Sequence, residues 1–318
     1  MPTHAHHEAW LRAMPWVFVL IWSTGFIVAR YGMPHAPPFT FLAWRYALSI
    51  ALFLLWVWWA RVAWPRSRAQ WGHLAVLGLL MHAGYLGGVW AAVKAGMGAG
   101  LVALLVGLQP LLTAIWLSAV ASSQGAAAGL AVSRRQWLGL LLGLAGLVLV
   151  LWYQFVPPQA STDGAAAVGA ATGQIGATWF NVSLAVVALL SITAGTLYQK
   201  RYVQPCDVRS ANTVQLLAAL AVTLPLALLE PGGMNWNAEL AGALAWSVLA
   251  LTLGASSLLY LLIQRGAAAS VASLMYLVPP CTAVLAWLLF DEPITALTVA
   301  GVALTALGVS LVVRSPRA

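Results

Sequence analysis

Apolar stretches of about twenty residues follow one another along almost the whole 318-residue chain. A helix needs about 20 predominantly apolar residues to cross a bilayer. Hydrophobic residues make up 62% of the chain and charged residues only 7%, whereas a soluble domain carries about 25% charged residues. A soluble core of this length would not hide so much apolar surface. The sequence therefore predicts an all-α integral membrane protein in contact with membrane lipid.

Ten stretches are long and apolar enough to be membrane spans. The N-terminus lacks the short apolar core and small-residue cleavage site of a signal peptide, so the first stretch is expected to remain as a span. The connections between several stretches are very short, which predicts tight antiparallel helical hairpins. The ten predicted transmembrane helices are 15–33, 38–60, 73–93, 97–120, 135–156, 178–200, 211–230, 239–263, 267–290 and 294–313.

The basic residues indicate how these spans are oriented. With the N-terminus in the cytoplasm, twelve of the fifteen Lys and Arg residues fall on the cytoplasmic side, as the positive-inside rule requires. The sequence thus predicts a bacterial inner-membrane protein whose tails, 1–14 and 314–318, are both cytoplasmic. The net charge of +8 is then a signal of topology, and no nucleic-acid partner is expected.

The chain also aligns with itself. The segment GLVALLVGLQPLLTA at 100–114 matches ASVASLMYLVPPCTA at 269–283, with a fixed offset of 169 residues. Nearer the front, WSTGFIVAR at 22–30 matches ITAGTLYQK at 192–200 more weakly. These matches predict an internal duplication.

The duplication predicts two five-helix repeats, 15–156 and 178–313, joined by an extracytoplasmic linker at 157–177. Because five is an odd number, the second copy enters the membrane from the opposite side, and the repeats are inverted. Inverted repeats recur in secondary transporters, where the solute site lies near the midplane between the copies. We therefore expect a carrier for a small-molecule solute.

Three segments carry a resemblance to a known family: WSTGF at 22–26, FLAWRYAL at 41–48 and ASLMYLVPPCTAVLAWLLFDEPIT at 272–295. They resemble the EamA-type domain of the drug/metabolite transporter superfamily, whose relatives include amino-acid exporters and nucleotide-sugar and triose-phosphate translocators. The resemblance implies efflux of an amino-acid-like or drug-like solute by alternating access. It also implies that the hairpins of spans three–four and eight–nine act as gates. The first repeat departs from the pattern, because it has no acid that matches Glu292.

Polar and aromatic side chains recur at helical spacing inside the spans. His82, Tyr85 and Trp90 share one face of the third span, and the eighth span carries a polar stripe in i, i+4 steps that includes Thr252. Such groups suit an organic solute with apolar and polar parts. The alternative is that the hydroxyls bond to their own backbone, that the aromatic rings pack, and that His82 makes an interhelical hydrogen bond. The predicted solute-binding residues are Trp22, Arg45, His82, Tyr85, Trp90, Gln109, Tyr198, Thr252, Ser256, Tyr260 and Tyr276.

Arg45 is the one permanent charge within the run PPFTFLAWRYALSIALFLLWVWWA at 37–60. At 1.5 Å per residue it lies roughly 10 Å below the outer surface. An arginine facing lipid at a helix centre costs on the order of 3 kcal/mol. The side chain either snorkels outward or faces the bundle, where it meets an anionic group of the solute or carbonyls at a helix end.

Two prolines occupy matching positions in the repeat, Pro110 and Pro279. A proline inside a helix removes a backbone hydrogen bond, which membrane helices tolerate where the freed carbonyl is satisfied or lines a cavity. We expect both to be hinges of the gating hairpins. The alternative is an inherited packing kink.

Other classes of function are less well supported by the sequence. A His-Glu-x-x-His helix, a Gly-x-Ser-x-Gly elbow and a carboxylate pair within the spans are all missing from the sequence, so neither an intramembrane enzyme with catalytic residues nor a bound cofactor or metal is expected. A passive pore is the alternative to a carrier, but its polar lining would run continuously from face to face. Glycines spaced along the fifth and tenth spans pack either within the protomer or in a homodimer.

Overall fold

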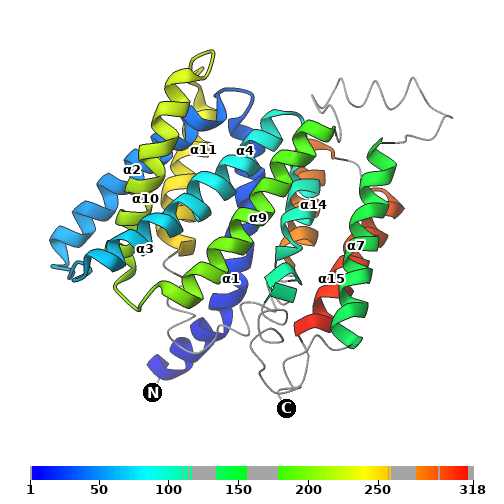
Figure 1. Cartoon of the computed structure of the whole chain (residues 1–318), viewed down its shortest axis with the longest axis horizontal. Helices are drawn as coiled ribbons and strands as arrows, with labels where there is room; N and C mark the ends of the chain where they lie inside the picture. Colours follow the sequence, from blue (N-terminus) through cyan, green and yellow to red (C-terminus); the bar gives the residue numbers. More distant parts are fainter. Residues whose placement is uncertain are drawn as a thin grey trace.

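The computed structural model describes residues 2–109, 111–113, 115–116, 134–155, 178–256, 258, 277–292 and 294–313. The described residues form helices and turns, with no strand among them (Figure 1). The elements are α1 (Pro2–Gly32), α2 (Pro38–Trp59), α3 (Arg68–Gly78), η1 (Leu79–Leu86), α4 (Gly87–Lys94), α5 (Ala99–Val106), α7 (Arg134–Phe155), α9 (Trp179–Tyr202), α10 (Val208–Leu229), α11 (Ala238–Trp246), η3 (Ser247–Ala255), α14 (Val278–Phe290) and α15 (Ala296–Val313). The all-helical class predicted from the sequence is confirmed.

Five of the described helical segments are long and apolar enough to cross a membrane. They are Pro38–Trp59, Arg68–Lys94, Trp179–Tyr202, Val208–Leu229 and Ala238–Ala255. Shorter apolar helices lie in the other five predicted stretches. The structure therefore supports an integral membrane protein, while the count of ten spans and their inverted arrangement remain predictions.

Local sequence signals explain where several helices begin. Pro38 occupies the first turn of α2, where a missing backbone N–H costs nothing. Side-chain N-caps start other helices: the Ser67 hydroxyl accepts from Gln70 N at α3, and the Asp207 carboxylate accepts from Arg209 N at α10. These caps satisfy backbone donors that have no partner within the helix.

Two helical rods contain a π-helical segment, and both segments occupy the same place in the duplication. The segment η1 lies within the continuous rod 68–94, and η3 follows α11 in the rod 238–255. The offset of 169 residues seen in the sequence places η1 on residues 248–255, which are all in η3. The duplicated sequence thus carries a duplicated backbone irregularity.

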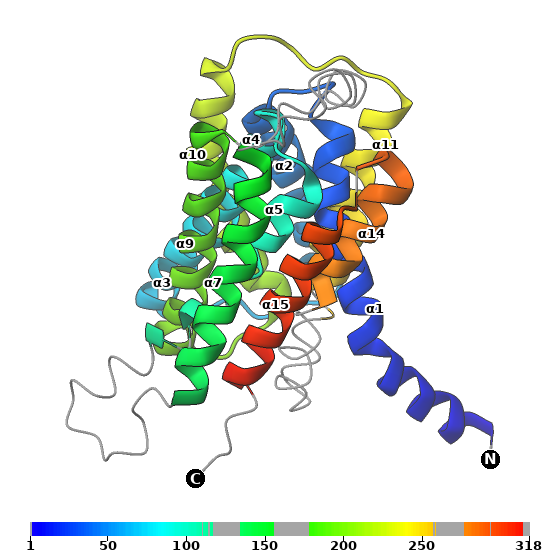
Figure 2. The same ribbon diagram turned by 90° about the vertical axis from the view of Figure 1, so that its right-hand side faces the viewer.

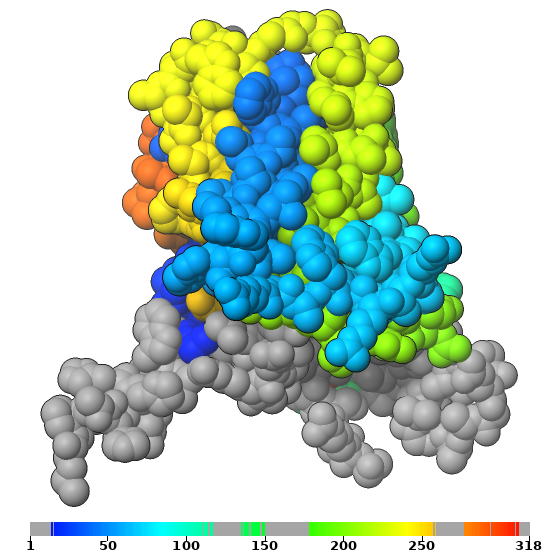
Figure 3. Space-filling view, turned by 90° about the vertical axis from the view of Figure 1, so that its left-hand side faces the viewer, coloured from blue at the N-terminus to red at the C-terminus, as the bar shows by residue number. Residues whose placement is uncertain are grey.

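Most of the helices form one bundle with a common hydrophobic core. On one face, α2 lies between α10 and α11 (Figure 3). The helix α9 crosses the rod of η1 and α4 at two glycines: a Cβ on Gly84 would meet the Ser191 hydroxyl, and one on Gly88 would meet the backbone of Leu184. Elements of the first and second halves of the chain are therefore interleaved.

The helices α7 and α15 pack against each other at one side of the bundle (Figure 2). A Cβ on Gly146 would lie 2.5 Å from the carbonyl oxygen of Gly301, and one on Gly308 would meet the backbone of Gly139 and Gly143. The glycines of the predicted fifth and tenth spans thus pack within one chain, which was one of the two alternatives. The linker predicted at 157–177 lies outside the described residues.

Candidate functional site

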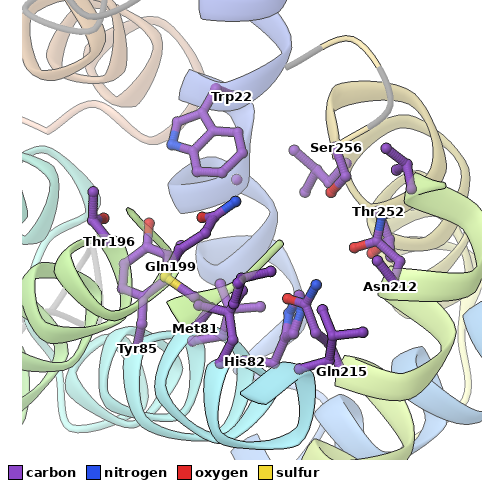
Figure 4. A pocket seen from close by; sticks show the side chains of 18 of the residues that line it. Trp22, Met81, His82, Tyr85, Thr196, Gln199, Asn212, Gln215, Thr252 and Ser256 are labelled. Carbon is purple, nitrogen blue, oxygen red and sulfur yellow. The ribbon is translucent and has the colours of Figure 1, made fainter. Parts of the chain in front are cut away.

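A cavity of about 660 Å³ lies among the helices of the bundle. Its walls come from both halves of the chain: α1, α2, the α3–η1–α4 rod, α9, α10 and η3 (Figure 4). Small-molecule sites have volumes of roughly 300–1,000 Å³. The lining residues are Trp22, Gly25, Phe26, Arg45, Leu74, Leu77, Met81, His82, Tyr85, Leu86, Val89, Trp90, Thr196, Gln199, Lys200, Val203, Gln204, Pro205, Cys206, Val208, Ala211, Asn212, Gln215, Leu251, Thr252 and Ser256.

Arg45 belongs to the cavity wall and not to the lipid-facing surface. Its side chain is only 6% exposed, and its Nε donates a hydrogen bond of 3.1 Å to Thr252 Oγ1. This is the one hydrogen bond between the guanidinium and the part of the chain that the structure describes. The two terminal nitrogens keep their donors available to the cavity. The structure thus decides against snorkelling.

The π-helical segment η3 positions Thr252. The Thr252 hydroxyl donates 2.9 Å to the carbonyl oxygen of Ser247, five residues earlier. The same oxygen atom accepts from Arg45 Nε. The guanidinium is therefore held to the backbone of η3 through the Thr252 hydroxyl. Because a hydroxyl carries one donor and two acceptor sites, it satisfies both roles at once.

Aromatic residues also line the cavity. Trp90 is 1% exposed and stacks on Phe41, with ring centroids 4.3 Å apart. The Tyr46 hydroxyl donates 2.8 Å to the backbone carbonyl of His82, and the two rings meet edge to face. Trp22 extends from α1 and also lines the cavity (Figure 4). Trp22, His82 and Trp90 thus line the cavity, while Phe41 and Tyr46 pack against two of them from outside the lining.

The lining contains two cationic side chains, Arg45 and Lys200, and no acidic one. Four of the described acids have partners elsewhere. Asp207 is paired with Arg209 at the start of α10, and Glu230 accepts from the backbone of α2. Glu239 bonds to a histidine, and Glu292 accepts from the first N–H of α5. The cavity is therefore electropositive.

The two ends of the cavity differ. At one end the lining includes exposed residues of the connection between α9 and α10, among them Gln204 and Pro205. Cys206 lies in the same connection, where its Sγ accepts from Gln70 Nε2 at 3.7 Å, and burial raises the pKa of its thiol. At the other end, the last lining residue of the α3–η1–α4 rod is Trp90, whose ring stacks on Phe41 of α2. The cavity thus opens toward the α9–α10 connection.

Most of the described candidates from the sequence line this cavity: Trp22, Arg45, His82, Tyr85, Trp90, Thr252 and Ser256. Gln109 and Tyr198 are not in the lining. The amide of Gln109 donates 3.1 Å to Thr196 Oγ1, which is a lining residue. Tyr198 faces α3 instead, where its hydroxyl lies 2.8 Å from His73 Nδ1.

Three candidates, Tyr260, Tyr276 and Pro110, lie outside the described residues. The other predicted hinge, Pro279, is buried in the first turn of α14. A Cβ on Gly107, at the end of α5, would lie 2.8 Å from Pro279 Cγ. The segments around the two matching prolines therefore touch, and their role as hinges stays a prediction.

Several polar lining residues were missed by the sequence analysis, and four of them form two pairs on two helices. Thr196 and Gln199 lie on α9, and Asn212 and Gln215 lie on α10 (Figure 4). Each pair is spaced i, i+3, which places both side chains on one helix face. An i, i+3 polar pair inside an apolar span was the signal that would have found them.

Comparison with known proteins agrees with this arrangement. The model of the EamA-like transporter family matches the chain twice, at residues 13–152 and 179–314. The chain belongs to the EamA-like transporter family. An uncharacterized transporter of Archaeoglobus fulgidus is 24% identical over 295 residues, which cover 92% of this chain and 93% of that protein.

A second relative of this EamA-like chain is a probable amino-acid metabolite efflux pump of Salmonella typhimurium. It is 25% identical over 210 residues, which cover 66% of this chain and 60% of the pump. A solved crystal structure aligns over 94% of both chains with a TM-score of 0.57 and 20% sequence identity. At that identity the likeness bears on the fold alone.

Proposed function

We propose that the chain is a secondary carrier that exports a small organic metabolite across the bacterial inner membrane by alternating access. The observation that carries this proposal is the cavity, whose walls come from both halves of the chain and whose lining reaches exposed residues of the connection between α9 and α10. A site reached from one side at a time is what alternating access requires. The Salmonella relative, a probable efflux pump for an amino-acid metabolite, supports efflux of an amino-acid-like solute.

Two features of the backbone support the proposed pair of inverted repeats. The π segments η1 and η3 recur at the offset of the sequence duplication. The helices α2 and α10 each have 22 residues and begin 170 positions apart. With five spans in each repeat, 15–156 and 178–313, the second repeat enters the membrane from the other side. Two similar halves then give inward-open and outward-open states of similar energy.

The proposed orientation places the open end of the cavity in the cytoplasm. The exposed basic residues Arg61, Arg66, Arg68 and Arg201 lie in or beside the connections at this end. Cytoplasmic loops carry such an excess of Lys and Arg. The structure would then represent the inward-open state of the carrier, ready to accept solute from the cytoplasm.

Counterflow tests the proposal. Purified protein is reconstituted into liposomes loaded with one unlabelled solute of a metabolite panel, and the same solute, labelled, is added outside in trace amount. A carrier concentrates the label transiently inside, because the unlabelled solute exchanges against it. A passive pore, the alternative function, lets the label equilibrate without any overshoot, and that result would contradict the proposal.

A further inference from the structure

The charged groups of the cavity define the chemical class of the solute. We propose that this carrier selects solutes with one carboxylate on an apolar, aromatic-sized body, and that Arg45 binds the carboxylate. The inference rests on the proposed carrier function and narrows it. A solute that is cationic, or that has no acidic group, is excluded.

The first step is the state of the guanidinium. Arg45 is nine-tenths buried, and its Nε is held by Thr252 while its terminal nitrogens have no partner in the described part of the chain. Arginine forms paired, nearly parallel hydrogen bonds with carboxylates. The Nε contact fixes one edge of the guanidinium and leaves the end with both terminal nitrogens for such a pair.

The second step is the missing counter-charge. The chain has seven Asp and Glu residues in total, and none is in the cavity lining. The segment 257–276, part of which the structure does not describe, contains no acid in its sequence. A buried ion without a compensating charge is costly. An anionic solute supplies that charge, whereas a cation would add to the repulsion.

The third step is the number of anionic groups. The helices α2 and α10 correspond at an offset of 170 residues, which pairs Arg45 with Gln215. Both residues line the cavity, but Gln215 is neutral. The duplication therefore provides one guanidinium and not two, and the second cation, Lys200, lies near the open end. Binding of one carboxylate in the depth of the cavity follows.

The fourth step is the rest of the solute. The apolar lining includes Trp22, Phe26, Tyr85, Trp90 and Leu251. Neutral polar side chains of α9, α10 and η3 face the same space. Flat aromatic walls favour an apolar body of similar size through offset or edge-to-face contacts. The cavity of about 660 Å³ accommodates such a molecule together with water.

The test uses three ligands with the same body and different charge: 3-phenylpropanoate, 3-phenylpropanamide and 3-phenylpropylamine. Their dissociation constants for the purified full-length protein are measured by calorimetry at neutral pH and low salt. We expect the acid to bind at least tenfold more tightly than the amide and the amine. Binding of the amine as tightly as the acid would overturn the inference, and so would binding of none of the three at millimolar concentration.

Variants then connect the selectivity to Arg45. In Arg45→Gln the acid should bind no better than the amide, and Arg45→Lys should recover part of the preference. Arg30→Gln removes a positive charge from α1, outside the cavity lining, and should leave the acid-to-amide ratio unchanged. An unchanged ratio in Arg45→Gln would overturn the assignment. Should that variant fail to fold, the three ligands on the natural protein still decide the solute class.

Counterflow with labelled 3-phenylpropanoate separates this inference from the carrier proposal. Selective binding of the acid without counterflow of any panel solute would refute the carrier and leave the selectivity intact. Counterflow of the amine in preference to the acid would refute the selectivity and leave the carrier intact.

Discussion

At the scale of residues, a single buried charge determines most of the chemistry. The apolar run around Arg45 predicted a guanidinium at membrane depth, with the cavity-facing position slightly favoured over snorkelling. The structure distinguishes these two positions, because Arg45 donates a hydrogen bond to Thr252, on an element more than 200 positions away.

Helical periodicity reveals which residues share a face of one helix. It does not reveal which neighbouring helix that face meets, and so Tyr198 was expected in a cavity that it does not line.

Replacing Thr252 by valine should weaken binding of 3-phenylpropanoate by about tenfold. The substitution keeps the shape of the side chain but removes the oxygen that accepts from Arg45 Nε, and hydrogen bonds to charged groups contribute about 1.5–3 kcal/mol. Thr252→Ser keeps the oxygen and should restore the affinity. Calorimetry with the acid and its amide checks this, because a general packing defect would weaken both ligands alike and serine would not repair it.

At the scale of elements, the apolar runs predicted where helices occur but not their internal geometry. The span predicted at 38–60 corresponds to α2 at Pro38–Trp59, because the prolines at 37 and 38 mark the start of the helix in the local sequence. The first helix is longer than predicted and begins at Pro2. The π segments η1 and η3 were not predicted, because an extra residue in a helical turn is stabilised by contacts with other helices and leaves little local signal.

Gly146→Ala should destabilise the pair of helices α7 and α15. The added methyl would lie 2.5 Å from the carbonyl oxygen of Gly301, a rigid backbone atom, and overpacking of this kind costs about 1–3 kcal/mol. Gly242→Ala, on α11 with nothing within 4 Å of the new methyl, is the matched control. That change should be neutral or stabilising because alanine favours helices. Melting temperatures in detergent should fall for the first variant only.

Asp207→Ala should lower stability by about 1 kcal/mol at neutral pH, since the carboxylate caps α10. The hydrogen bond from Arg209 holds the pKa of Asp207 below its ordinary value of 3.8. A lowered folded-state pKa means that the stabilisation is complete above the unfolded value and is lost as pH falls below it. The difference between natural protein and variant should thus be constant from pH 8 to about pH 5. A melting-temperature difference that shrinks in that range would contradict this assignment.

At the scale of the whole molecule, the closed and open ends of the cavity are made by different kinds of contact. At the end near Trp90, two carboxylates of the second half of the chain cap helices of the first half. Glu230 accepts from Phe39 N and Thr40 N of α2, and Glu292 accepts from Ala99 N of α5. The sequence shows both acids at span ends, but not their partners, which lie at least 190 positions away. Contacts that close a cavity depend on the packed halves, so only a structure reveals them.

On the proposed carrier mechanism, in which this structure is the inward-open state, Glu230→Ala should shift the protein away from that state. Both carboxylate oxygens bond to α2, at 2.8–3.0 Å from the Phe39 N, Thr40 N and Thr40 Oγ1 atoms, and the variant leaves these donors to water. The outer end then opens more readily, and the inner end closes when it does.

Cys206 reports this shift, because it lies at the inner opening of the cavity. In a Cys281→Ala background, Glu230→Ala should slow maleimide labelling of Cys206 several-fold. Labelling is best compared near pH 9, since the raised pKa of the half-buried thiol leaves little thiolate at neutral pH. Glu239→Ala is the matched control: it removes an acid at the same end whose partner is His35, and Glu239 is 61% exposed. Exposed pairs contribute little, so this variant should label like the natural protein. Equal slowing by both variants would mean that negative charge at this end of the bundle, and not the cap on α2, controls access to Cys206.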